Sequence, residues 1–140
     1  MVEIKGITKI IYISGAYWID GPYVGKYSIE INPKKLTGKY NYESNFYKNE
    51  IIWKYSKRHY FKFIDELVDL NVFSWKKEYL NENVCDGGYW SLKFEYKNNS
   101  FEIIGDNDYP ENYDDFFNIM VKYFPILQWD YEYRRKIEKR

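Results

Sequence analysis

Apolar and polar residues alternate along much of the first half of the chain, and this pattern predicts β-strands. The segment from Ile7 to Ile13 is rich in β-branched residues, and the segments Tyr23 to Ile31 and Lys39 to Phe46 place apolar residues at alternate positions. A period of two puts successive side chains on opposite faces of a sheet. The three segments therefore predict an antiparallel meander that buries one face.

The period changes to that of a helix in two later segments. Ser56 is a predicted N-cap, and the apolar residues that follow it recur at helical spacing as far as Leu70. Asn112 is expected to cap a second helix, with Asp114 and Asp115 in the first turn, where the helix dipole favours negative charge. The apolar stripe of this second helix is the most regular in the chain, and Pro125 ends it: Tyr113, Phe116, Phe117, Met120, Val121 and Phe124.

A β-hairpin is predicted between the two helices. Asp86-Gly87 marks a turn, and the segment from Tyr89 to Lys97 alternates strictly, with its aromatic and aliphatic side chains on one face. Asn98-Asn99 tolerates the backbone angles of a tight turn. The segment from Phe101 to Ile104 should therefore pair back antiparallel.

These elements predict an α+β fold in the order β-β-β-α-β-β-α, in which two helices pack on one face of an antiparallel sheet. No linker or repeat interrupts the chain, so residues 1–140 are expected to form one domain, with 126–140 as a C-terminal extension. This tail fits a strand through Trp129, Tyr131 and Tyr133, and it fits a helix through its i, i+3 and i+4 spacings; its basic end favours the helix. The predicted core brings sheet and helix together: Trp90, Leu92, Phe94, Phe116, Phe117 and Met120.

The composition favours binding over catalysis. Seventeen of the 140 residues are Tyr, whereas the chain has one His, one Cys and a formal net charge of zero. His and Cys carry most nucleophilic, metal and proton-transfer chemistry near neutral pH. We therefore expect no enzyme activity, no cofactor and no metal site.

Three groups of polar residues are candidates for chemistry, and each has a simpler structural explanation. Five carboxylates lie between Asp106 and Asp115, but their spacing does not match a calcium-binding EF-hand loop, and acids are common where a helix begins. The basic cluster from Lys54 to Lys62 is interleaved with aromatic residues, but a chain with a pI near 6.6 lacks the strong basic bias of a nucleic-acid-binding domain. A dyad of His59 and Cys85 would require the two residues to be adjacent in space.

The chain shows no sign of membrane insertion or export. No apolar run approaches the roughly 20 residues that a membrane-spanning helix needs. The first residues lack the features of a signal peptide, and a single Cys fits a reducing compartment. We therefore expect a cytoplasmic protein.

One part of the chain resembles other proteins. The pattern D-G-x-x-W-x-L-x-x-x-Y beginning at Asp86, followed by G-x-N-x-Y-P-x-N beginning at Gly105 and then an aromatic-rich helix, resembles a recurrent unit of small, uncharacterised bacterial proteins. The resemblance covers about residues 61–124. It implies no activity, so it supports only the predicted fold.

The predicted function is that of a non-enzymatic protein that binds another macromolecule, most simply a protein. A role of immunity type or inhibitor type in bacterial or phage conflict would suit a small single domain. A small-ligand-binding module with an aromatic-lined pocket is the alternative, and a homodimer is a further form of partnership.

The abundance of Tyr predicts where a partner would bind. Each buried hydroxyl group needs a hydrogen-bond partner, so some of these rings should be exposed. We expect one contiguous aromatic patch built from the meander and the tail: Tyr17, Trp18, Tyr23, Tyr40, Tyr42, Trp129, Tyr131 and Tyr133. In the alternative arrangement, the tail packs over the meander and hides its rings.

Overall fold

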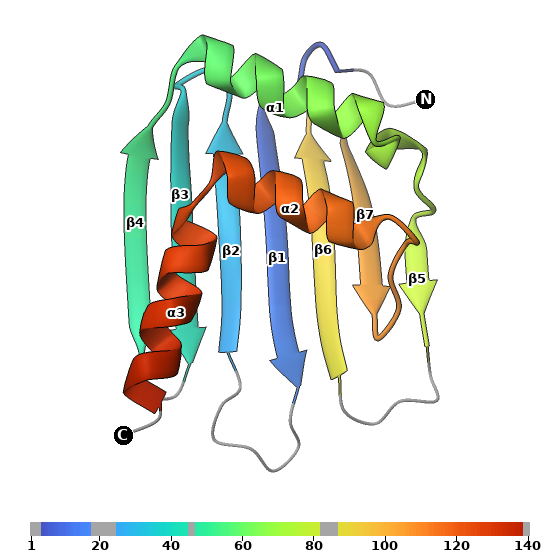
Figure 1. Cartoon of the computed structure of the whole chain (residues 1–140). Coiled ribbons are helices and arrows are strands. Elements are labelled where there is room, and N and C mark those ends of the chain that lie inside the picture. The colour runs from blue at the N-terminus through green and yellow to red at the C-terminus, as the bar shows by residue number, and fades with distance from the viewer. Residues whose placement is uncertain (1–3, 18–24, 45–46, 82–86, 139–140) are drawn as a thin grey trace.

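Seven strands form a single sheet, and helices cover one of its faces (Figure 1). The computed structural model describes residues 4–17, 25–44, 47–81 and 87–138. The strands are β1 (Lys9–Tyr17), β2 (Gly25–Asn32), β3 (Thr37–Ser44), β4 (Lys48–Lys54), β5 (Glu78–Leu80), β6 (Gly87–Glu95) and β7 (Ser100–Asp106). The α+β class predicted from the sequence is confirmed.

The strands lie in the order β4-β3-β2-β1-β6-β7-β5. Strands β1 to β3 form the predicted meander, which β4 extends by one strand, and β6 and β7 form the predicted hairpin. The two units join through β1 and β6, which pair antiparallel along their whole length. The short strand β5 pairs parallel to β7 at the far edge. The prediction lacked β4 and β5, so the observed element order differs in detail.

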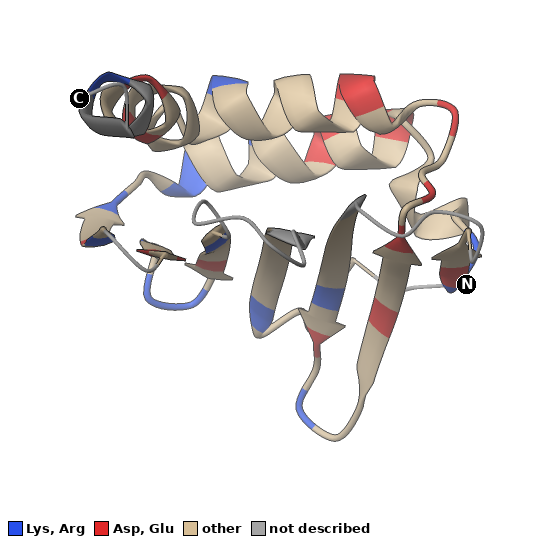
Figure 2. Ribbon diagram, turned by 90° about the horizontal axis from the view of Figure 1, so that it is seen from below, with Lys and Arg blue, Asp and Glu red and all other residues tan. Residues whose placement is uncertain are grey.

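Three α-helices lie in one layer over the sheet, as Figure 2 shows from below. They are α1 (Lys57–Asp69), α2 (Tyr113–Tyr123) and α3 (Ile126–Glu138), with a short 3-10 turn, η1, at Val72–Ser74. Helices α1 and α2 cross the strands, whereas α3 runs along them in front of β3 and β4 (Figure 1). The tail is therefore a helix, and the strand interpretation of its alternating aromatic residues is wrong.

The two predicted N-caps have different outcomes. The Ser56 hydroxyl accepts a hydrogen bond from the backbone N–H of His59 at 3.0 Å, which confirms the cap of α1. Asn112 precedes α2 as predicted, but its side chain makes no capping bond. Its amide oxygen accepts from Nε1 of Trp75 at 2.9 Å and its amide nitrogen donates to the carbonyl of Leu70 at 2.8 Å. Asn112 thus ties the start of α2 to the segment after α1, and the predicted side-chain cap is wrong.

The core lies between the sheet and the helix layer, as predicted, with one exception. Five of the six predicted core residues are buried: Trp90, Leu92, Phe94, Phe116 and Met120. Phe117 is only partly buried, because it lies at the edge of the α2 stripe beside a cavity. It forms instead a wall of the candidate site.

The opposite face of the sheet carries charged residues, which are coloured in Figure 2. Three ion pairs cross between neighbouring strands: Lys9 with Glu30 at 3.2 Å, Lys48 with Glu43 at 3.3 Å and Lys39 with Glu50 at 3.9 Å. Such exposed pairs contribute little to stability. We refer to this surface as the open face.

Within the described ranges, no helix is long and apolar enough to cross a membrane.

Candidate functional site

A buried carboxylate holds α3 on the sheet. Asp130 is fully buried and accepts hydrogen bonds from three described residues in β3, in β4 and just before β4. The hydroxyl of Tyr40 donates at 2.5 Å, the hydroxyl of Tyr47 at 2.9 Å and the side-chain amide of Asn49 at 2.9 Å. A buried charge needs hydrogen-bond partners, because moving a charged group out of water costs free energy. The contact therefore fixes the position of α3 over β3 and β4.

This position of α3 hides part of the predicted aromatic patch. Tyr40 and Tyr42 are buried, so the expectation that they belong to an exposed surface is wrong. Their rings lie on the helix-covered face of β3, where the tail packs over the meander. Trp18 and Tyr23 lie outside the described residues, as does the side chain of Tyr17.

The three aromatic residues predicted on the tail are exposed, as expected. They do not form one surface, because they lie on two flanks of α3. Trp129 and Tyr133 stack on each other with an interplanar angle of 5°, and the ring of Tyr133 also contacts Tyr47. Tyr131 lies on the other flank, beside a cavity. The contiguous patch is thus replaced by two separate aromatic sites.

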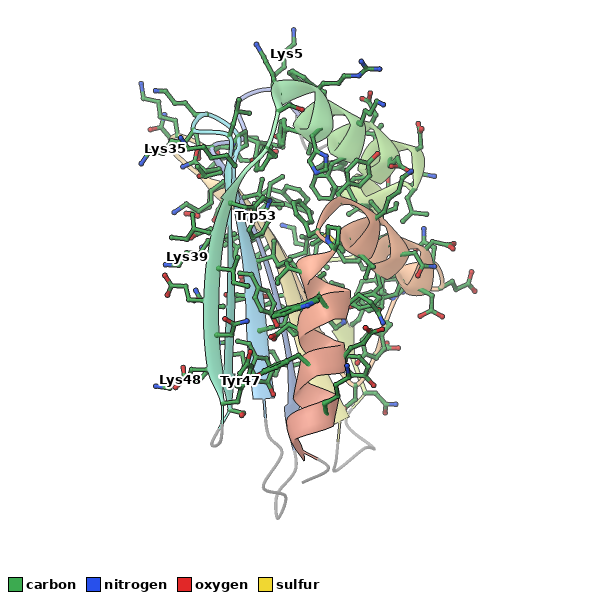
Figure 3. The ribbon with its side chains drawn as sticks, turned by 60° about the vertical axis from the view of Figure 1, so that its left-hand side comes forward. Lys5, Lys35, Lys39, Tyr47, Lys48 and Trp53 are labelled. Carbon is green, nitrogen blue, oxygen red and sulfur yellow. The ribbon has the colours of Figure 1, made fainter. Side chains whose placement is uncertain are left out.

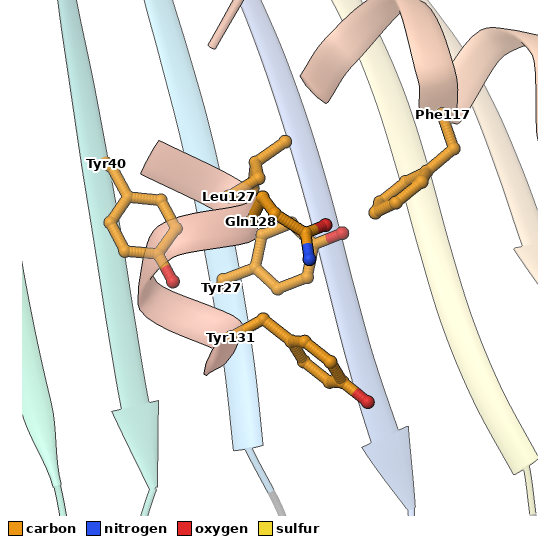
Figure 4. A pocket seen from close by; sticks show the side chains of 6 residues that line it. All are labelled: Tyr27, Tyr40, Phe117, Leu127, Gln128 and Tyr131. Carbon is orange, nitrogen blue, oxygen red and sulfur yellow. The ribbon is translucent and has the colours of Figure 1, made fainter. Parts of the chain in front are cut away.

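The cavity beside Tyr131 opens between α2, α3 and the floor of the sheet (Figure 4). Its volume is about 250 Å³. Strands β2 and β3 supply the floor, α2 one wall and α3 the other: Tyr27, Tyr40, Phe117, Leu127, Gln128 and Tyr131. Four of these six residues are aromatic, so the cavity presents mostly apolar ring surface.

A shallower groove of about 400 Å³ adjoins this cavity along α2. Tyr27 and Phe117 line both hollows, so the two lie side by side. The groove is lined by Tyr12, Ser14, Tyr27, Tyr109, Pro110, Glu111, Tyr113, Asp114 and Phe117. We call the cavity and the groove together the aromatic trough.

Two hydroxyl groups that line the groove, those of Tyr12 and Tyr113, have raised pKa values. The hydroxyls of Tyr12 and Tyr113 hydrogen-bond to each other. Burial raises the pKa of Tyr12 well above its usual value, and the nearby Tyr27 and Tyr113 raise it further. Burial likewise raises the pKa of Tyr113. Both groups therefore keep their protons at neutral pH and can donate or accept hydrogen bonds.

The charged residues that line the trough have one sign. Glu111 and Asp114 stand at its rim, and no Lys, Arg or His is among the described residues that line it. Rings and carboxylates together favour a cation, because the face of an aromatic ring is electron-rich. The trough can thus hold an apolar group at one end and a positive group at the other.

The groups proposed from the sequence for other chemistry have structural roles or stay untested. Nε2 of His59 lies 3.0 Å from the carbonyl of Tyr123, and its ring packs between Tyr55 and Tyr123. Cys85 lies outside the described residues, so the His59–Cys85 dyad stays untested. In the part of the chain that the structure describes, no three His, Cys, Asp or Glu residues lie close enough together to hold a metal ion.

Sequence reasoning missed the two residues that shape this site. The apolar stripe of α2 predicts Phe117 in the core, because the sequence does not indicate which edge of the stripe is left partly exposed. Asp130 is not among the predicted site residues, because the sequence of the tail fits both a strand and a helix. Its position three residues after Leu127, on the same side of a helix, is the signal that could have placed it in the buried stripe.

No protein-family model matches the chain, and no curated protein matches its sequence. The resemblance predicted for residues 61–124 stays a prediction.

Proposed function

We propose that this chain is a non-enzymatic binding protein that captures an extended segment of a partner protein in the aromatic trough. The observation that carries the proposal is the lining of the trough: among the described residues it combines aromatic rings with the carboxylates of Glu111 and Asp114 and has no Lys, Arg or His. A partner segment would place one apolar side chain in the cavity and a Lys or Arg beside the groove.

The size of the cavity favours a side chain over a whole ligand. Pockets for small molecules usually measure about 300–1,000 Å³, and this cavity is about 250 Å³. A pocket that takes one apolar anchor is typical of the centre of a protein interface, where a few aromatic or aliphatic residues supply most of the binding energy.

The carboxylates at the rim favour a basic residue in the partner. Asp114 and Glu111 are exposed, so they remain accessible to an incoming cation. Charges at a rim contribute more to partner choice and association rate than to affinity. The proposed partner segment therefore carries an apolar anchor followed or preceded by a positive charge.

A small organic cation with an apolar ring is the second candidate. The groove of about 400 Å³ is large enough to accept one on its own, and its floor offers the hydroxyls of Tyr12 and Tyr113. This corresponds to the aromatic-lined pocket considered from the sequence.

A role of immunity type or inhibitor type would be one form of such protein binding. It rests on the size and composition of the chain alone. The trough adds the kind of contact that such a protein would use.

Selection from a random peptide library displayed on phage tests the proposal. Peptides that bind the immobilised protein should share an apolar anchor within a few residues of Lys or Arg. Their affinity should fall at least about tenfold for Gln128→Trp, because the larger side chain fills the cavity mouth. The double variant E111K/D114K should select against the basic peptides.

Glu132→Trp is the matched control for the cavity. Gln128 and Glu132 share a hydrogen bond of 3.0 Å on α3, so both substitutions remove it and both add an indole to the same helix. Glu132 does not line the trough, so the control should bind the peptides as the wild type does. Equal binding by Gln128→Trp, or a library that yields no consensus, would contradict the proposal. Tryptamine that binds where no peptide does would favour the second candidate.

A further inference from the structure

The two edges of the sheet differ in the length of their strands. Strand β4 is an edge strand of seven residues, whereas β5 at the opposite edge has three. Short edge strands limit unwanted pairing, and long ones offer a row of backbone groups to another chain. Figure 3 brings the β4 edge forward.

The hydrogen bonds to β3 show which backbone groups of β4 point outward. Ser44 donates to the carbonyl of Tyr47 at 2.9 Å, and Tyr55 donates to the carbonyl of Leu36 at 3.1 Å. Antiparallel ladders alternate residue by residue, so the odd-numbered residues of β4 bond to β3. The even-numbered residues, from Lys48 to Lys54, direct their N–H and C=O groups to the outer side, where no described strand lies.

The side chains of the same even-numbered residues lie on the open face. In Figure 3, Lys48 points away from the helices and Trp53 points toward them. Lys48, Glu50, Ile52 and Lys54 are all exposed. Ile52 is 64% exposed, the highest value among the exposed large hydrophobic residues of the described chain. An apolar residue with charged residues on both sides is unusual at an edge that meets only water.

The charges on β4 complement those of a second copy of the same strand over the longest stretch when the axis lies at Ile52. With a two-fold axis at Ile52, the two Ile52 side chains face each other and Glu50 faces Lys54 of the second copy on both sides of the axis. Opposite charges across two strands stabilise a sheet, and like charges destabilise it. An axis at Asn49 would also oppose Lys48 to Glu50, but it would pair only three residues of β4, whereas the axis at Ile52 pairs five. An axis at Ile51 would oppose Lys48 to Lys54, and an axis at Glu50 would oppose that residue to itself.

From these observations we infer that β4 pairs antiparallel with β4 of a second copy of this chain around a two-fold axis at Ile52, so that one sheet runs through both molecules. Glu50, Ile52 and Lys54 supply the backbone hydrogen bonds, because their N–H and C=O groups face outward. The interface uses the same residues on both copies, as a two-fold dimer requires. Main-chain pairing at an exposed edge is a common mode of protein recognition. This surface is separate from the aromatic trough.

A charge exchange tests the inference. Sedimentation velocity over about a hundredfold range of concentration should show a monomer–dimer equilibrium for the wild type. Glu50→Lys and Lys54→Glu should each raise the dissociation constant by about tenfold, because like charges then face each other twice. The double variant E50K/K54E restores opposite charges and should recover most of the lost affinity.

Glu102→Lys is the matched control. Glu102 is exposed and pairs in register with Lys93 on the open face, away from the β4 edge. This control should dimerise as the wild type does. A wild type that stays monomeric at every concentration overturns the inference. The inference is also overturned if Glu50→Lys and Lys54→Glu dimerise as the wild type does. The same holds if the dissociation constant of the double variant is no lower than those of the single variants.

Disulfide formation tests the register independently. In a background with Cys85→Ser, which removes the native Cys, Ile52→Cys should give a covalent dimer on mild oxidation. Directly paired residues of this kind have Cα atoms about 5.5 Å apart, which is within the range that a disulfide spans. Glu50→Cys should not link to itself but should link to Lys54→Cys when the two variants are mixed. Self-linkage of Glu50→Cys with none at Ile52→Cys would overturn the proposed axis.

Discussion

Helices α2 and α3 pack on the same face of the sheet but are held there by different kinds of contact. The contact of α2 with the sheet is largely apolar, since Phe116 and Met120 are fully buried. The ring of Phe116 lies edge-on to the ring of Tyr12, and the two ring centroids are 5.3 Å apart. The contact of α3 centres on the carboxylate of Asp130. Apolar packing tolerates small shifts, whereas three hydrogen bonds to one carboxylate define a position. The cavity at one end of the trough lies between the two helices, so its width depends on both kinds of contact.

The largest expected effect comes from breaking the apolar contact. Phe116→Ala should lower the free energy of unfolding by about 3–5 kcal/mol, because it leaves a cavity under α2. Urea denaturation followed by fluorescence would measure the loss. Phe61→Ala is the control, since Phe61 is exposed on α1 and its truncation should change stability by about 0.5 kcal/mol or less. Equal losses for the two variants would contradict the difference in packing.

Breaking the polar contact should have a smaller and more local effect. Asp130→Asn keeps the shape of the side chain but removes the charge that three donors share, and we expect a loss of about 1.5–3 kcal/mol. Hydrogen exchange should rise mainly in α3 and in the strands beneath it, while α2 stays protected. Glu132→Gln, an exposed carboxylate on the same helix, should leave exchange unchanged. A uniform rise along the chain would show that α3 does not open separately.

The smallest effect concerns the hydrogen bond between Tyr113 on α2 and Tyr12 on β1. Tyr113→Phe removes the hydrogen bond to Tyr12, and we expect it to cost about 1 kcal/mol near neutral pH. Since burial raises the pKa of Tyr113 in the folded protein, the folded state retains a proton that the unfolded state loses above about pH 10. The free energy of unfolding of the wild type should therefore fall as the pH rises above this value. The difference in free energy of unfolding between the wild type and Tyr113→Phe should then shrink.

Urea unfolding at about pH 8 and about pH 11 would measure both parts of this prediction. Tyr131→Phe is the control, because the ring of Tyr131 is exposed on α3. If the difference in free energy of unfolding between the wild type and Tyr113→Phe grew with pH, this would contradict the raised pKa of Tyr113.

Regular patterns were predictable from the sequence, and irregular ones were not. The strict alternation in β6 and the apolar stripe of α2 gave both elements and most of the core. Strand β4 was missed because Ile51, Ile52 and Trp53 are consecutive apolar residues, which hides the alternation of an edge strand. Strand β5 is too short to carry a pattern.

The candidate site depended on a contact that the sequence does not encode locally. Tyr40 and Tyr42 alternate like residues of any half-buried strand, and only the docking of α3 decides that they are buried. Phe117 is apolar and lies on the correct face of its helix, yet it borders the trough because α3 diverges from α2. The hydrogen bonds that Tyr40 and Tyr47 donate to Asp130 join residues distant in the sequence, which no local pattern could predict.

The place of β1 in the sheet has a consequence for synthesis of the chain. Strand β1 is paired on one side by β2, which follows it directly, and on the other side by β6, which is made much later. At about 5–20 residues per second, the interval lasts on the order of seconds. During it, the nascent meander presents one unpaired side of β1 to its surroundings. Pauses in translation between β4 and β6 should therefore lower the yield of folded protein more than pauses after β7.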